Sequence, residues 1–72
     1  MLRHKYLFLE IGANNIVTQK RVFKTREAGM RLMERKLINL DSEVATVLYR
    51  DARKHLQEFI CTNGLVFIIN RI

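Results

Sequence analysis

The chain has 72 residues and carries thirteen Lys and Arg against seven Asp and Glu, which gives a net charge of +6. This length is typical of one small domain, residues 1–72, with a marginal core of its own. The charge excludes an acidic mimic of nucleic acid and favours attraction to polyanions. Cys61 is the only cysteine, which excludes an intrachain disulfide and is typical of a reducing compartment. His4 and His55 do not have zinc-site spacing with Cys61, so we expect neither a metal nor a cofactor.

The N-terminal stretch LRHKYLFLEIG is not typical of a targeting signal. Its apolar run is shorter than that of a signal peptide and is interrupted by Glu10. No apolar run approaches the roughly 20 residues that span a bilayer. We therefore expect a soluble, cytoplasmic protein without a membrane partner.

Residues 6–11 and 16–23 are predicted to form a β-hairpin. Apolar residues occupy both alternating faces of the first strand, which indicates an inner strand that is covered on each side. The segment from Gly12 to Asn15 has the composition of a turn. The β-branched residues of IVTQKRVF then favour a returning strand.

Residues 26–38 are predicted to form a helix that begins after Thr25. The Thr25 hydroxyl can accept a hydrogen bond from a free amide of the first turn, and Glu27 lies favourably near the positive end of the helix dipole. Gly29 falls on the apolar side, where its missing side chain would let the helix approach a sheet closely. The apolar stripe comprises Ala28, Gly29, Leu32, Met33, Leu37 and Leu40.

Residues 44–60 are compatible with two different structures. Their apolar residues fit one stripe of a helix, whereas VATVLY and the Asn63-Gly64 turn signal favour strands. We favour the strands. They are predicted at 44–49, 55–62 and 65–71, with a turn at 51–54.

A two-residue turn at Asn63-Gly64 defines the predicted register of the last hairpin. It pairs Cys61 with Val66, and it requires a positive φ at both turn residues. The predicted fold class is therefore α+β, with a β-hairpin, one helix and a three-stranded antiparallel meander in one sheet.

The tail carries a Cys61-x-Asn63-Gly64 turn, then Phe67 and a closing INR. In these features the segment of roughly 25–72 resembles small uncharacterised proteins of bacterial phages and mobile elements. The resemblance implies a helix followed by a strand meander, and an origin in a mobile element. It implies no active-site residue.

Four positive charges lie in KRVFKTR, where the chain enters the predicted helix. Positive side chains are unfavourable at that end of a helix unless an anion is present, so a phosphate of a nucleic acid backbone would remove the conflict. The competing interpretation is that these side chains extend into water. Aromatic residues lie within apolar strands and are predicted to be core. The candidate nucleic-acid-binding residues are Lys20, Arg21, Lys24, Arg26, Arg31, Arg35, Arg50, Arg53 and Lys54.

No residue pattern indicates catalysis. His55 and Cys61 lie too far apart along a strand to act together, Cys61 is expected to be buried, and Asp51 and His55 have no accompanying nucleophile. We therefore predict a non-enzymatic binding protein, associated with nucleic acid or a nucleoprotein complex, with no small-molecule substrate. The alternative is a phage or mobile-element inhibitor of a host defence complex that acts through protein–protein contacts.

The first and last strands are apolar on both faces, whereas one helix covers only one face of a sheet. A second protomer or a foreign protein is expected to cover the other face. We therefore predict a homodimer or a hetero-complex.

Overall fold

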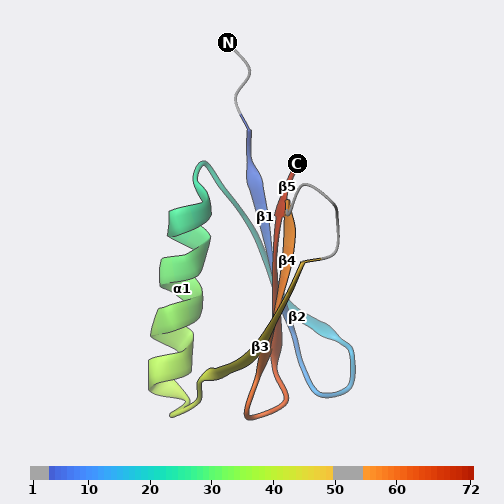
Figure 1. The fold of residues 1–72 in the computed structure, drawn as a ribbon, viewed down its shortest axis with the longest axis vertical. Coiled ribbons are helices and arrows are strands. Elements are labelled where there is room, and N and C mark those ends of the chain that lie inside the picture. The colour runs from blue at the N-terminus through green and yellow to red at the C-terminus, as the bar shows by residue number, and fades with distance from the viewer. Residues whose placement is uncertain (1–3, 50–54) are drawn as a thin grey trace.

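The computed structural model describes residues 4–49 and 55–72, and these residues form one helix packed on one antiparallel sheet (Figure 1). The predicted α+β class is confirmed, and each described element lies within one residue of its predicted bounds. The elements are β1 (Tyr6–Ile11), β2 (Val17–Phe23), α1 (Arg26–Asn39), β3 (Val44–Tyr49), β4 (Leu56–Cys61) and β5 (Val66–Arg71).

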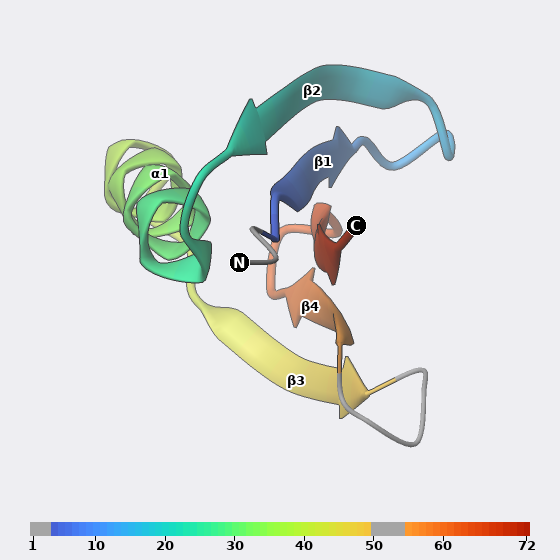
Figure 2. The same ribbon diagram turned by 90° about the horizontal axis from the view of Figure 1, so that it is seen from above.

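The sheet contains five described strands in the order β2-β1-β5-β4-β3, and all neighbouring strands are antiparallel. The predicted three-stranded meander does not match this sheet in detail, because β5 pairs with β1 as well as with β4. β1, the first described strand in the chain, and β5, the last, therefore lie side by side near the centre of the sheet (Figure 2).

The segments 44–49 and 56–61 are strands, so the alternative of a helix through this region is wrong. In β4, Gln57, Phe59 and Cys61 are buried while the intervening residues are partly exposed. Burial of every second residue is typical of a strand and not of a helix. In β3, the β-branched residues of VATVLY favour the extended chain. The turn predicted at 51–54 lies outside the described residues.

The last hairpin has a different register from the predicted one. Cys61 N–H donates to the Leu65 carbonyl at 2.9 Å, and Gly64 N–H donates to the Cys61 carbonyl at 3.1 Å. Cys61 therefore pairs with Leu65 instead of Val66, and the connection holds one more residue than predicted. Gly64 has a φ of 89°, as three-residue hairpin loops require at their last position. The prediction of a positive φ at Asn63 is wrong; its Oδ1 instead accepts a hydrogen bond from Leu65 N–H at 3.2 Å.

The helix α1 begins where its capping residue predicts. Thr25 Oγ1 accepts a hydrogen bond from Ala28 N–H at 3.2 Å. The sequence places Leu40 on the apolar stripe, and this prediction is wrong. Leu40 is 51% exposed, because it is the C-cap and lies beyond the last helical turn. The buried helix residues are Gly29, Met33 and Leu37. In the described part of the chain, no helix has the length and apolar character needed to cross a membrane.

The helix covers only part of one face of the sheet. Among the described elements, the backbone of α1 lies closest to β5, β1 and β2 (Figure 2). Phe59 and Cys61 of β4 are nevertheless buried in the same core cluster as the helix residues Met33 and Leu37. Gly29 lies at the contact, where an added Cβ would be 3.5 Å from Ile69 Cδ1 and 3.7 Å from the Phe23 ring. Val47 and Tyr49, which face the same side from β3, remain partly exposed beside this core.

Phenylalanine side chains form the centre of the core. Phe8 and Phe67 are fully buried, and their ring centroids lie 5.6 Å apart. Phe23 meets Phe8 edge to face, with the centroids 6.2 Å apart. The prediction that the aromatic residues are core is confirmed for these rings. It is wrong for Tyr49, which is 52% exposed on the edge strand β3.

The side of the sheet that faces away from α1 is here termed the open face. It is formed by the residues that alternate with the core residues along each strand. Among the described elements, no helix lies over it (Figures 1 and 2). The residues of the open face are Leu7, Leu9, Ile11, Val22, Leu48, Leu56, Ile60, Val66 and Ile68, together with Lys20, Thr46, Glu58 and Asn70.

Candidate nucleic-acid interface

The basic segment Lys20 to Arg26 is divided between the two sides of the sheet. Lys20 pairs with Leu9 and belongs to the open face. Arg21, the next residue, points to the side that carries α1, because successive strand residues point to opposite faces. The structure therefore separates Lys20 from the other basic residues of the segment. The predicted residues Arg50, Arg53 and Lys54 lie outside the described part of the chain.

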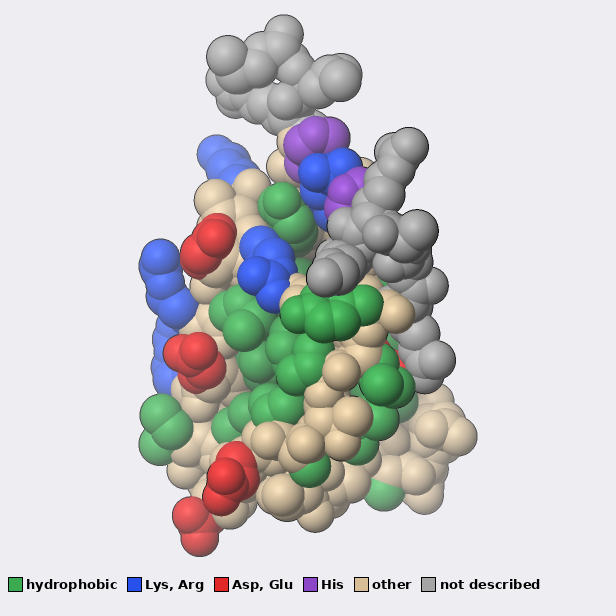
Figure 3. All heavy atoms as spheres, viewed as in Figure 1, with side chains coloured by type: hydrophobic (Ala, Val, Ile, Leu, Met, Phe, Trp, Pro, Cys, Tyr) green, Lys and Arg blue, Asp and Glu red, His purple; other side chains and the backbone are tan. Residues whose placement is uncertain are grey.

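Three of the predicted arginines line one depression between β2 and α1, here termed the β2–α1 groove. It has a volume of about 290 Å³, and its basic residues are Arg21, Arg31 and Arg35. The Arg21 guanidinium lies over the Phe23 ring, 5.2 Å from its centroid. Arg31 and Arg35 are four residues apart and so lie on one side of the helix. Figure 3 shows basic side chains along the outer side of α1, with acidic ones between them.

Lys24 and Arg26 lie at a second depression, beside the first turn of α1. It has a volume of about 330 Å³ and is also lined by His4, Tyr6, Thr25 and Glu27. Glu27 contributes a negative charge to this depression. An anion is therefore less favoured here than in the β2–α1 groove.

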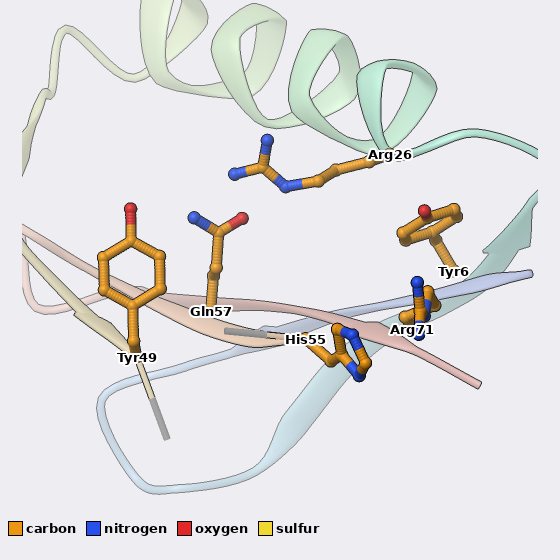
Figure 4. A pocket seen from close by; sticks show the side chains of 6 residues that line it. All are labelled: Tyr6, Arg26, Tyr49, His55, Gln57 and Arg71. Carbon is orange, nitrogen blue, oxygen red and sulfur yellow. The ribbon is translucent and has the colours of Figure 1, made fainter. Parts of the chain in front are cut away.

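A third depression, here termed the α1 pocket, lies between the start of α1 and the sheet (Figure 4). Its volume is about 340 Å³. Figure 4 shows the side chains of Tyr6, Tyr49 and Gln57 rising from the strands toward α1, with the Arg26 side chain extending above them. The lining residues are Tyr6, Arg26, Tyr49, His55, Gln57 and Arg71.

The pairing of the strands brings the residues of the α1 pocket together. Tyr6 pairs with Arg71, and Arg71 N–H donates to the His55 carbonyl at 3.0 Å. Tyr49 pairs with Gln57 across β3 and β4. The pocket lies beyond the core cluster that α1 forms with Phe59 and Cys61, at a place where Tyr49 of the edge strand β3 is exposed.

Gln57 is a buried polar residue at the floor of the pocket. Its side chain is only 5% exposed, and Oε1 has no hydrogen-bond partner among the described residues. An unsatisfied buried acceptor costs about 1–3 kcal/mol. A ligand that brings an N–H or O–H donor into the pocket would relieve this penalty.

Of the residues in the α1 pocket, the sequence predicts only Arg26 as a site residue. Tyr6 and Arg71 are separated by most of the chain, and their proximity depends on the β1–β5 pairing. Gln57 does carry a sequence signal, because it occupies a buried position in the alternating segment LQEFIC. A polar residue at such a position indicates either a buried hydrogen bond or a site.

Cys61 packs as a small apolar residue, as predicted. It is 4% exposed, and burial raises the pKa of its thiol. The thiol therefore stays protonated at neutral pH. In the described part of the chain, no group of three or more His, Cys, Asp and Glu side chains is placed to hold a metal ion.

Comparison of the chain with protein-family models, with curated proteins and with solved structures gave no match.

Proposed function

We propose that the protein is a small, basic, non-enzymatic binding protein of the cytoplasm that associates with nucleic acid or with a nucleoprotein complex. The β2–α1 groove is the observation that supports this best, because two elements place three guanidinium groups around one depression. A guanidinium group stays charged and binds phosphate oxygens through paired hydrogen bonds. The net charge of +6 adds attraction over longer distances.

Contacts in this groove are suited to positioning a nucleic acid and not to reading its sequence. Phosphate contacts carry no direct sequence information. Phe23, the aromatic residue of the groove, already contacts the Phe8 ring and the Arg21 guanidinium. We therefore propose that binding depends little on base sequence.

A salt series with single-stranded and double-stranded DNA and RNA of mixed sequence tests the proposed function. Each phosphate contact contributes roughly 0.7–0.9 to the slope of log affinity against log salt. We expect a slope of about two to three if the three arginines make the contacts. Absence of binding at low salt, or an affinity that does not change with salt, would overturn the proposal.

The open face supports a second candidate function, in which the protein acts through protein–protein contacts. The mobile-element inhibitor of a host defence complex belongs to this class. Apolar side chains from all five described strands contribute to the open face. Contiguous apolar surface of this kind marks interaction sites in soluble proteins.

We propose a second copy of the chain as the occupant of the open face. Lys20, Leu9, Ile68, Glu58 and Leu48 form one row across the five strands. A twofold rotation about an axis along β5 brings Lys20 within about one strand spacing, ~5 Å sideways, of Glu58 of the partner subunit. The opposite charges of Lys20 and Glu58 therefore support packing of the open face against the open face of a second copy.

A further inference from the structure

We propose that the α1 pocket binds the terminal nucleotide of a single-stranded nucleic acid, at an end that carries a phosphomonoester. This inference rests on the proposed association with nucleic acid and adds a site separate from the β2–α1 groove. The phosphate lies between Arg26 and Arg71, and an N–H group of the base reaches Gln57.

The charges of the α1 pocket suit a phosphomonoester. Arg26 extends from α1 above the pocket, and Arg71 belongs to β5 below it (Figure 4). Arg26 is the first residue of the helix, where a positive side chain opposes the helix dipole unless an anion is bound. A phosphomonoester carries nearly two negative charges at neutral pH and matches the two guanidinium groups. An internal phosphodiester carries only one.

Gln57 distinguishes this pocket from a site for a simple anion. Its side chain is 5% exposed and rises toward α1, and Oε1 lacks a partner among the described residues. A phosphate can only accept hydrogen bonds from this pocket, so it cannot satisfy a carbonyl oxygen. Each nucleic acid base has an N–H donor on its pairing edge, which is accessible in a single strand. A terminal nucleotide therefore supplies both the anion and the donor.

The aromatic residues of the pocket suit a base. Tyr49 is 52% exposed and pairs with Gln57, so a base bound to Gln57 lies beside the Tyr49 ring. Tyr6 lines the part of the pocket next to Arg71. Stacking on such rings depends little on which base is present. We therefore expect little preference among the four bases.

The size of the pocket favours one nucleotide over a longer stretch of chain. Its volume of about 340 Å³ lies at the lower end of the range for small-molecule sites. The strands lie below the pocket, and α1 lies above it (Figure 4). One terminal unit fits such a space, and the rest of the strand leaves through the mouth.

Fluorescence anisotropy with short single strands tests the proposal on the unmodified protein. Three strands of one sequence are compared: with a 5′-phosphate, with a 3′-phosphate, and with hydroxyl groups at both ends. We expect a phosphate at one of the ends to tighten binding about tenfold. A phosphorylated end without a base should lose most of this gain. If free nucleoside monophosphates bind as tightly as the strands, the pocket takes free nucleotides and the strand-end proposal is overturned.

Two variants test the individual contacts. Arg71→Gln should remove the preference for a phosphorylated end, and Gln57→Leu should remove the difference between a terminal nucleotide with a base and one without. Lys5→Gln is the matched control, since it also removes one positive charge beside Tyr6. Lys5 precedes Tyr6 in an extended segment and so points to the opposite side of the sheet. Circular dichroism verifies that each variant is folded.

The outcomes separate this inference from the proposed function. Equal affinity for all three strands, with a steep salt dependence, overturns the pocket and leaves the β2–α1 groove in place. Binding of no strand overturns both. Two further outcomes overturn the pocket: a preference for a phosphorylated end that persists in Arg71→Gln, and a difference between ends with and without a base that persists in Gln57→Leu.

Discussion

Lys36 Nζ lies 3.0 Å from Glu10 Oε1, and this ion pair joins the helix α1 to the strand β1. The Thr18 hydroxyl donates a hydrogen bond to Glu10 Oε2. Burial raises the pKa of Glu10, but the hydrogen bonds from Thr18 and Lys36 and the Lys36 charge together outweigh it. The pKa of Glu10 is therefore lowered from its ordinary value of 4.5. The folded protein thus stabilises the ionised carboxylate.

Glu10→Gln is expected to lower the free energy of unfolding by about 1–2 kcal/mol at pH 7. Because the pKa of Glu10 is lower in the folded state, its contribution is present above the unfolded pKa and is lost as the pH falls through the folded pKa. Urea unfolding should therefore show a smaller difference at about pH 3 than at pH 7. Glu34→Gln, on an exposed part of α1, is the control. An equal effect of Glu10→Gln at both pH values would contradict the linkage.

Gly29→Ala is expected to stabilise the protein. Alanine is favoured over glycine within a helix by about 1 kcal/mol. The added methyl group would lie 3.5 Å from Ile69 Cδ1, which is an ordinary van der Waals contact. Thermal unfolding should show a melting temperature higher by roughly 4–8 °C. A lower melting temperature would mean that the helix and the sheet approach each other too closely at Gly29 to accommodate the added methyl group.

Gly64→Val is expected to destabilise the protein by about 1–3 kcal/mol. The backbone of Gly64 has a φ of 89°, and no atom lies within 4 Å of an added Cβ, so the penalty comes from the backbone alone. Gly64→Asn is the matched control, because asparagine adopts left-handed conformations more readily than other residues. Denaturant unfolding should show a much smaller loss for Gly64→Asn than for Gly64→Val.

Arg21→Gln is expected to weaken nucleic acid binding more than Lys20→Gln does. The two residues are adjacent in sequence and lose the same charge, but only Arg21 lines the β2–α1 groove. The salt slope should fall by roughly one unit for Arg21→Gln and should change little for Lys20→Gln. Equal losses from the two substitutions would mean that net charge, and not the groove, governs binding. The assay compares the variants at protein concentrations where they have the same oligomeric mass.

The chain is expected to form a dimer at micromolar concentration through the open face. Lys20→Glu should weaken the dimer, because it faces Glu58 of the partner subunit with a like charge. Exchanging the charges, with Lys20→Glu and Glu58→Lys together, should restore most of the association. Sedimentation equilibrium measures the mass of each variant. A monomer at high micromolar concentration, or capture of a foreign protein on this face, would reject the second copy.

The sequence predicts the elements well, because their signals are local. Thr25 defines the start of the helix, and the alternation in LQEFIC defines a strand. The register of the last hairpin could not be predicted in the same way. One additional loop residue changes the partner of Cys61 from Val66 to Leu65, and the Asn63-Gly64 signal is compatible with both loop lengths.

The basic residues of the candidate interface could be identified from the sequence, whereas their grouping could not. Lys20 and Arg21 are neighbours in the chain but lie on opposite faces, because strands alternate. Arg71 lies beside Tyr6 only through pairing between the first and last strands. Contacts of such long sequence separation leave no pattern within a single sequence.

The central position of β5 determines when the protein can fold during its synthesis. All the other strands of the sheet leave the ribosome before β5 does. Until it appears, β1 and β4 have no common neighbour, and Phe8 lacks the Phe67 ring against which it packs. Without β5, the β1–β2 hairpin can still pack against α1, but the β3–β4 pair has no neighbour among the described strands that joins it to the hairpin. The five-stranded sheet is therefore completed only once β5 is present, through a pairing of high contact order.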